Sequence, residues 1–310
     1  MDTKFKKNIV LQNNYICKVG YLQNKTNYTS YKNQFNNDYN VGIPIKFCDV
    51  FILKLHPLVI AKEFCNCNLN PVIVNLVTEK YSEHNIENLE GVYDEILNLR
   101  TNFQSISKQN NNFPPKENEV IYTPQVMVIR DETLNLIQNF SNIFKVSFIT
   151  ISSKPELYKI FQYYESTNDT DESNSEKDSD DSEESNKDIK TIMSVETYLA
   201  YKSKIELILQ TAHYAGNQVV IFNDFGCLAD KIPIDDFTEI CNSCILKYGH
   251  LFHQIVFAIN VRTPVEQLLF EQLLNNIIRP QEIIKKDSEE DQEQDKLLAN
   301  IIIKSSSVSC

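Results

Sequence analysis

The sequence predicts an α/β protein built as a three-layer α/β/α sandwich with a mixed central sheet. Two short runs, the wholly apolar 219–222 and the segment 254–259, which is apolar after Gln254, have the length and the β-branched content of buried strands. The segments at 205–216 and 235–247 carry apolar residues at helical spacing. Because these helices alternate with the apolar runs, the region predicts parallel strands that are buried on both faces.

The remaining elements are predicted from the same two periodicities. Further apolar runs predict strands at 15–19, 50–55, 72–76, 126–129 and 146–151. Helical spacing recurs at 58–64, 86–99, 134–140 and 265–274. Pro57 suits the first turn of the helix that follows it, because a proline there loses no helical hydrogen bond. The apolar run at 297–303 is compatible with either a late strand or a docking segment.

The distribution of charge along the 310 residues separates two acidic segments from a neutral remainder. Residues 165–190 contain eleven acids and three lysines, and residues 281–296 contain seven acids and three lysines, so these two segments carry the whole net charge of −12. We expect residues 1–40 to be an amino-terminal extension, 41–280 to be one domain, and 281–310 to be a charged tail. Within the domain, 165–190 has too little apolar surface to order and predicts a disordered acidic insertion.

The balance of charge outside those segments also limits the function. The rest of the chain is neutral and has no basic run, which argues against a nucleic-acid partner. The sequence contains no run of about 20 apolar residues, which is the length that a membrane-spanning helix needs. The first charged residues are not followed by the apolar segment of a secretory signal peptide. The cysteines lie within apolar patterns, as reduced cysteines do. We therefore expect an intracellular protein, cytoplasmic or nuclear.

Two stretches carry a family resemblance. Residues 122–131 read YTPQVMVIRD, and residues 204–227 read KIELILQTAHYAGNQVVIFNDFGC. Their order and spacing resemble the microbial-type poly(ADP-ribose) glycohydrolase (PARG) family. The resemblance implies a macrodomain-like fold, ADP-ribose or poly(ADP-ribose) as the partner, and hydrolysis of the ribose–ribose O-glycosidic bond without a cofactor. In open α/β sheets ligands bind where strands end in loops, which points to the loop at 223–230.

The resemblance also implies the site residues. Asp94 and Glu95 occupy the positions of the family's acidic pair, with Glu95 as the proton donor to the leaving oxygen and Asp94 holding ribose hydroxyls. The positions that match the family's ligand-binding residues are Asn75, Asn85, Phe225, Gly226, Cys227 and Ala229.

Both expected ligand loops depart from the family pattern. Residues 82–85 stand where the family has three glycines, and Asn223 and Leu228 replace glycines of the second loop. Each replacement adds a Cβ where backbone should approach the ligand closely. Glu83 and Asp224 add negative charge near the expected diphosphate. These changes favour a degenerate, inactive module that binds ADP-ribose or another partner. The alternatives are an active hydrolase that uses Glu95, and a scaffold whose acidic insertion recruits basic proteins.

The spacing of the cysteines and histidines shows whether the sequence predicts a metal site. Cys241 and Cys244 have CxxC spacing, and Cys65 and Cys67 lie elsewhere, so four thiolates for zinc are available. However, Cys241 and Cys244 fall on the apolar side of the helix expected at 235–247, which predicts buried, reduced thiols. The histidines show no metal-binding spacing, and the chain has neither a P-loop nor a GxGxxG motif. We therefore expect no metal site.

Overall fold

The computed structural model describes residues 3–18, 29–32, 48–78, 95–153, 159–164, 189–223 and 232–258. Its strands are β1 (Thr29–Lys32), β2 (Asp49–Leu53), β3 (Pro71–Thr78), β4 (Glu119–Val128), β5 (Phe144–Ser153), β6 (Ile160–Tyr164), β7 (Ile189–Met193), β8 (Val219–Phe222) and β9 (Gln254–Ala258). Its helices are α1 (Thr3–Lys18), α2 (Pro57–Asn66), α3 (Glu95–Arg100), α4 (Phe103–Ser107), α5 (Val195–Tyr214) and α6 (Ile234–Tyr248).

One mixed sheet forms the centre of the fold. Within the described chain it has seven strands in the order β1-β4-β5-β3-β8-β9-β2. The five strands from β5 to β2 are parallel, and β4 is antiparallel to both of its neighbours. The parallel pairing of β8 with β9 confirms the arrangement expected from the two apolar runs. The carboxyl ends of β3, β5 and β8 consequently lie at the same edge of the sheet.

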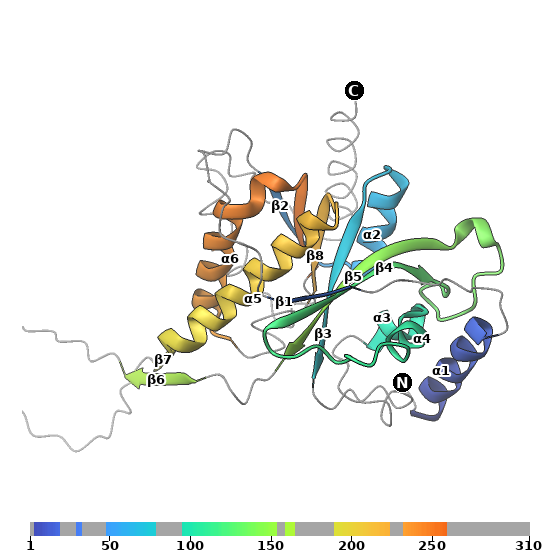
Figure 1. Ribbon diagram of the computed structural model, residues 1–310, viewed down its shortest axis with the longest axis horizontal. Helices are drawn as coiled ribbons and strands as arrows, with labels where there is room; N and C mark the ends of the chain where they lie inside the picture. The colour runs from blue at the N-terminus through green and yellow to red at the C-terminus, as the bar shows by residue number, and fades with distance from the viewer. Residues whose placement is uncertain are drawn as a thin grey trace, which may run out of the picture.

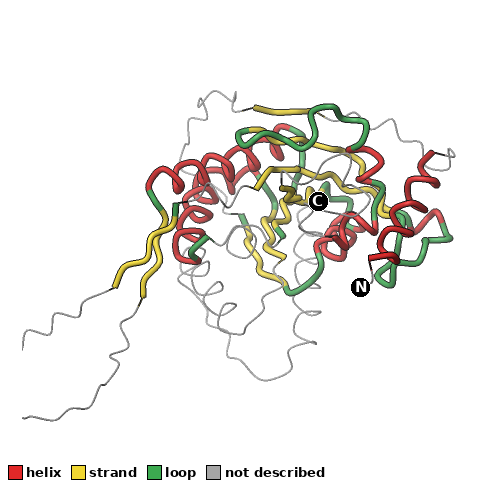
Figure 2. Tube along the Cα trace, turned by 90° about the horizontal axis from the view of Figure 1, so that it is seen from below, coloured by secondary structure: helices red, strands yellow, loops and turns green. Residues whose placement is uncertain are grey.

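Helices cover both faces of this sheet (Figure 1). One apolar core lies under α5 and α6 and includes Tyr201 and Phe237. A second core lies on the opposite face under α2, α3 and α4 and includes Phe64, Phe103 and Phe148. Viewed from below, the strands run between the helices of the two faces (Figure 2). The three-layer α/β/α architecture predicted from the sequence is therefore confirmed.

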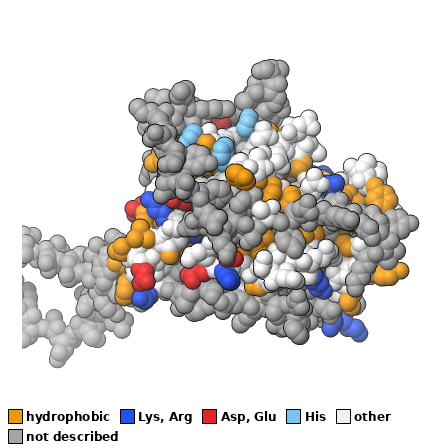
Figure 3. Space-filling view, in the orientation of Figure 1, with side chains coloured by type: hydrophobic (Ala, Val, Ile, Leu, Met, Phe, Trp, Pro, Cys, Tyr) orange, Lys and Arg blue, Asp and Glu red, His pale blue; other side chains and the backbone are white. Residues whose placement is uncertain are grey.

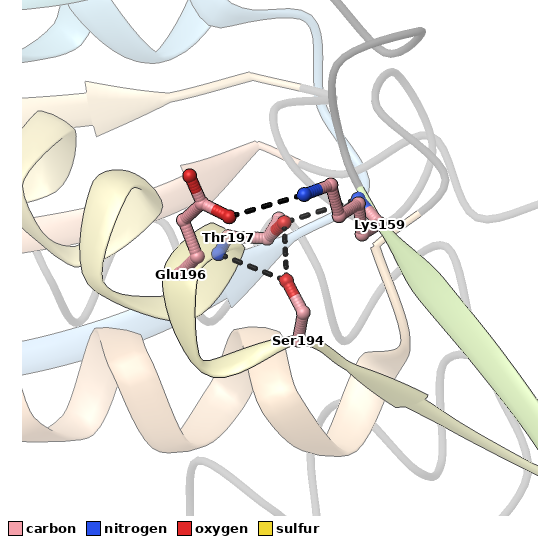
Figure 4. A network of polar contacts seen from close by, with 4 residues as sticks. All are labelled: Lys159, Ser194, Glu196 and Thr197. Carbon is pink, nitrogen blue, oxygen red and sulfur yellow. Dashed lines mark hydrogen bonds and ion pairs between the residues drawn. The ribbon is translucent and has the colours of Figure 1, made fainter.

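Helix α5 begins and ends at well-defined caps. Ser194 is the N-cap, and its Oγ accepts the backbone N–H of Thr197 at 3.1 Å. The Thr197 hydroxyl oxygen in turn accepts the backbone N–H of Lys159 at 3.0 Å, and Lys159 Nζ pairs with Glu196 Oε2 at 3.2 Å (Figure 4). The helix starts ten residues before the predicted segment because this polar cap, not an apolar stripe, sets its beginning.

The other end of α5 lies close to where the sequence places it. Gly216 adopts a φ of 74°, and its N–H donates to His213 O at 2.9 Å. The next N–H, of Asn217, donates to Ala212 O at 2.9 Å, which completes a Schellman motif. A glycine is required at this point because the left-handed conformation is costly for a residue with a Cβ.

Some predicted elements are wrong. The strand expected at 15–19 is instead the end of α1, a helix whose buried face includes Ile9, Val10 and Asn13. The helix expected at 134–140 is irregular, because Leu134 has a φ of 67°. The strand expected at 126–129, by contrast, is confirmed as the end of β4, which begins seven residues earlier and whose register shifts between Thr123 and Val126.

Other predictions fall partly or wholly outside the described residues. The expected helix at 86–99 is described only from Glu95 onward, as α3. The helix at 265–274 and the run at 297–303 lie outside the described chain. No helix within the described ranges is long and apolar enough to cross a membrane.

A two-stranded ribbon of β6 and β7 projects beside the amino end of α5. The strands are antiparallel, with Phe161 opposite Ile192, and the 24 residues between Tyr164 and Ile189 connect their far ends. Phe161 and Ile192 are exposed, as is Val195 at the start of α5. Figure 3 shows apolar side chains gathered at the left of the molecule, where this ribbon joins the domain.

Candidate functional site

Polar side chains cluster at the carboxyl ends of β3, β5 and β8. Asn75 of β3 is fully buried and lies opposite Thr150 of β5, to whose hydroxyl its Nδ2 donates at 3.4 Å. On the other side, Ile73 pairs with Ile221 of β8, so two residues further along Asn75 comes level with Asn223. Neighbouring strands are about 4.8 Å apart. The two asparagines are thus brought together by the register of the sheet.

These side chains share one face of the sheet. Residues alternate between the two faces along a strand. Ile73 and Ile221 belong to the core under α2, α3 and α4. Asn75 lies two residues after Ile73, and Asn223 lies two residues after Ile221, so both asparagines point to that same face. The candidate site therefore lies beside the layer that contains α3.

Several polar atoms at this edge are buried and have no hydrogen-bond partner among the residues that the structure describes. They are Asn75 Oδ1, Thr78 Oγ1, Ser152 Oγ, and both Oδ1 and Nδ2 of Asn223. A buried polar atom without a partner costs about 1–3 kcal/mol, so such groups are rare in folded proteins. By the alternation along each strand, Asn75, Ser152 and Asn223 lie on the face that contains α3, where a ligand at the strand ends could pair with them, whereas Thr78 lies on the α5 face.

A buried cation adjoins the same edge. Lys204 of α5 is 8% exposed, and its Nζ donates to the backbone carbonyl of Ser152 at 3.0 Å. The ammonium also lies 5.7 Å from the centre of the Tyr201 ring. Because Ser152 is the penultimate residue of β5, Lys204 brings positive charge to the end of the strand whose hydroxyl is unpaired.

The predicted proton donor Glu95 is the first residue of α3, and it is engaged by another helix. Lys6 Nζ of α1 forms a close ion pair with Glu95 Oε2. Glu95 is partly exposed, with 41% of its side chain accessible. Helix α1 is held next to it through Asn13, whose Nδ2 donates to Leu99 O at 2.9 Å. One carboxylate oxygen of Glu95 is consequently occupied by a lysine that lies far away in the sequence.

Of the predicted site residues, the structure describes only Asn75 and Glu95, and these belong to neighbouring layers. The others lie outside the described residues: Asp94, Asn85, Phe225, Gly226, Cys227 and Ala229. Sequence reasoning missed Thr78, Ser152 and Lys204. For Thr78 and Ser152 a signal was present, because each is a polar residue that closes an apolar run at the carboxyl end of a strand.

Cys241 and Cys244 are both buried, as the apolar side of their helix predicts. Desolvation by burial raises the pKa of the Cys244 thiol to about 12. Among the residues that the structure describes, no group of three or more His, Cys, Asp and Glu side chains is placed to hold a metal ion. His213 instead packs edge-on against Phe252, with ring centres 6.5 Å apart.

We expect Cys244 to resist alkylation in the folded protein, because the thiolate is the reactive form and burial suppresses it. Iodoacetamide at pH 8, followed by mass spectrometry of peptides, measures this directly. Half-buried Cys67 should react faster than Cys244, and unfolding in urea should abolish the difference. Equal labelling of both residues in the native protein would contradict the expected burial.

Comparisons with known proteins identify the fold. No protein-family model matches the chain, and no curated protein sequence matches it significantly. Solved structures do match. Poly(ADP-ribose) glycohydrolase from Thermomonospora curvata is similar with a TM-score of 0.59 at 14% identity, over 87% of this chain and 99% of that chain. The same enzyme bound to the inhibitor ADP-HPD gives a TM-score of 0.53 at 14% identity over the same shares.

Structures from a second species give the same result. A poly(ADP-ribose) glycohydrolase variant from Deinococcus radiodurans, in complex with ADP-ribose, has a TM-score of 0.50 at 12% identity, over 74% of this chain and 85% of that chain. At these identities the similarity establishes the fold. The macrodomain-like, PARG-like fold that the sequence predicts is therefore confirmed.

Proposed function

We propose that this protein binds ADP-ribose, free or as the terminal unit of its polymer, and does not hydrolyse it. The observation that carries the proposal is the set of buried polar atoms on Asn75, Ser152 and Asn223 that have no partner within the described chain. They lie at the carboxyl edge of parallel strands, where open α/β sheets bind nucleotides. Solved structures of the same fold contain ADP-ribose or ADP-HPD, which supports this choice of ligand.

The chemistry of the edge suits a nucleotide sugar. Amides and hydroxyls both donate and accept hydrogen bonds, as do ribose hydroxyls and the edge of an adenine ring. Lys204 adds positive charge at the end of β5 from the α5 side of the sheet, which would offset part of the diphosphate charge through space. This charge matters because the two expected ligand loops have lost glycines and gained acidic residues.

Two features argue against hydrolysis. Lys6 occupies Oε2 of Glu95, so this oxygen is not free to give a proton to a leaving ribose oxygen. The glycine-rich backbone that should hold the substrate close to such an acid is replaced at 82–85. Glu95 is nevertheless partly exposed. The competing function is therefore an active hydrolase that uses Glu95, and the cleavage assay described below distinguishes it from a protein that only binds.

Calorimetric titration with ADP-ribose tests the binding site through Asn223→Leu. This substitution keeps the side-chain volume and removes two unpaired atoms, so we expect unchanged or higher stability together with at least tenfold weaker binding. Asn66→Leu is the matched control, because Asn66 is exposed on α2 and bonds only to Glu63 among the described contacts. Equal affinity of wild type and Asn223→Leu would remove this edge as the site.

The second half of the proposal is tested with poly(ADP-ribose) as substrate. We expect no release of ADP-ribose by the wild-type protein. Release that disappears in Glu95→Gln would establish the competing hydrolase instead, while leaving the binding result intact.

A further inference from the structure

The β6–β7 ribbon and the start of α5 present an exposed apolar surface (Figure 3). Phe161 and Ile192 lie directly opposite each other in the ribbon, and both side chains are exposed. Val195 and Leu199 are also exposed, and their i, i+4 spacing makes them neighbours on one side of α5. The three residues from Ile192 to Val195 span at most about 11 Å, so the two pairs adjoin. We call these four residues the ribbon patch.

The base of the ribbon is fixed to the domain, which sets the position of the patch. Met193 is buried in the core under α5 and α6, and its backbone N–H donates to Asp236 Oδ2 of α6 at 2.7 Å. The next N–H, of Ser194, donates to Lys159 O at 2.8 Å. Because side chains alternate along a strand, burial of Met193 directs Ile192 outward. A surface held in this way needs little ordering when a partner binds, which favours affinity.

Negative charge borders the ribbon patch. The first two turns of α6 carry Asp235, Asp236 and Glu239. The hydroxyl of Tyr198 on α5 donates to Glu239 Oε1 at 3.2 Å, which places these acids beside the start of α5. Desolvation by burial, followed by the negative charge of Glu239, raises the pKa of Tyr198 to about 12. An apolar surface with a charged rim is typical of a protein interaction site, and this rim favours a positively charged partner.

The remaining charges near the ribbon strengthen this preference. Lys159, at the base of β6, is already paired with Glu196 Oε2 at 3.2 Å. Residues 165–190, which include the whole chain between the two strands, contain eleven acids and three lysines. A second copy of this chain would bring like charges together at the patch, whereas a basic partner would be attracted.

We propose that the ribbon patch is a docking surface for a segment of another protein whose apolar side chains are flanked by lysines or arginines. The apolar side chains of the partner pack on the four residues of the patch, and its basic side chains lie toward the acids of α6. This interaction is independent of ADP-ribose binding.

Three fluorescent peptides of equal length test the chemistry of the partner by anisotropy on the full-length protein. They are an amphipathic helix of leucine and lysine, the same sequence with glutamate in place of lysine, and oligolysine. The leucine–lysine peptide should bind at least about tenfold more tightly than the others, because it alone combines apolar and basic side chains. Either of the other peptides binding as tightly overturns the proposal, as does the absence of leucine–lysine peptide binding up to about 100 μM.

The salt dependence of the same binding tests the role of the acidic rim. Raising sodium chloride from about 0.1 M to about 1 M shortens the screening length from about 10 Å to about 3 Å. We expect the leucine–lysine peptide to bind about fivefold more weakly, or less, at the higher concentration. An affinity that does not fall would contradict the proposed charge complementarity.

A double variant, Phe161→Ala with Leu199→Gln, locates the binding on the patch. These side chains are 53% and 56% exposed, so the variant should keep the urea midpoint of the wild type and bind the leucine–lysine peptide at least about tenfold more weakly. The matched control makes the same two exchanges elsewhere, as Phe140→Ala with Leu11→Gln, at positions 60% and 44% exposed. Equal affinity of the two double variants would place the peptide elsewhere and overturn the proposal.

Sedimentation of the protein alone tests whether a second copy covers the patch instead. We expect a monomer, because the like charges around the patch repel. A dimer that dissociates in Phe161→Ala with Leu199→Gln, and persists in the control variant, would identify the occupant as a second copy and overturn the proposal.

Discussion

Arg130→Met is expected to destabilise the protein by about 3–5 kcal/mol, because hydrogen bonds made by a buried charged group are costly to lose. Arg130 is 3% exposed and joins three parts of the chain. Its guanidinium donates to Asn13 Oδ1 at 2.8 Å, to Leu134 O at 2.7 Å and to Gln12 Oε1 at 3.0 Å. Methionine fills most of the same volume and replaces none of these bonds.

The substitution should act first on helix α1. Gln12 and Asn13 belong to this helix, and among the described residues its buried apolar contact with the domain is small, with Ile9 and Val10 against Leu99 and Leu134. We therefore expect trypsin to cleave Arg130→Met within α1 much faster than it cleaves the wild type, in addition to a lower urea midpoint.

The control for this experiment is an exposed cation. Lys159→Met removes an ion pair with Glu196 whose side chains are 67% and 81% exposed. Exposed pairs contribute about 0–1 kcal/mol, so this variant should unfold almost as the wild type does. If Arg130→Met and Lys159→Met lose the same stability, α1 is not held in the way described.

Phe148→Ala is expected to cost about 3–5 kcal/mol, the usual loss when a buried phenylalanine is truncated in a close-packed core. Phe148 is fully buried in β5, and its ring centre lies 5.1 Å from that of Phe103 on α4. Phe103 in turn contacts Phe113 edge-on at 5.8 Å. Alanine would leave a cavity between the sheet and α4 that these rings have no room to close.

Urea unfolding followed by circular dichroism measures this loss. Phe161→Ala is the matched control, because Phe161 is 53% exposed on the β6–β7 ribbon and should change stability by about 0.5 kcal/mol or less. A loss for Phe148→Ala of the same small size would mean that the second core is not packed as described.

The elements that were predicted well are those whose own sequence decides their structure. β8 is apolar at every position because it is buried on both faces, and α6 shows an uninterrupted helical stripe; both are predicted to within one residue. Helix α1 was missed for a physical reason. It is held largely through polar side chains such as Asn13, whose partner Arg130 is 117 residues away, and hydrophobic periodicity carries no information about such a contact.

The candidate site was predictable only in part for the same reason. Asn75 was found because it matches a family position, whereas its closeness to Asn223 follows from strand register, which single-sequence patterns do not determine. The false helix at 134–140 has a local cause instead. The side chain of Asp131 satisfies the backbone N–H groups of Thr133 and Asn135, and this competes with helix formation.

The antiparallel pairing of β6 with β7 also has a practical consequence. Because Tyr164 pairs with Ile189, the two residues that flank the intervening 24 lie only one strand spacing apart. The entropic cost of closing a flexible loop rises by only about 0.6 kcal/mol for each doubling of its length. This stem is consequently a permissive position for protein engineering, where a reporter domain or a short glycine–serine linker can replace the acidic residues while the sheet keeps its register.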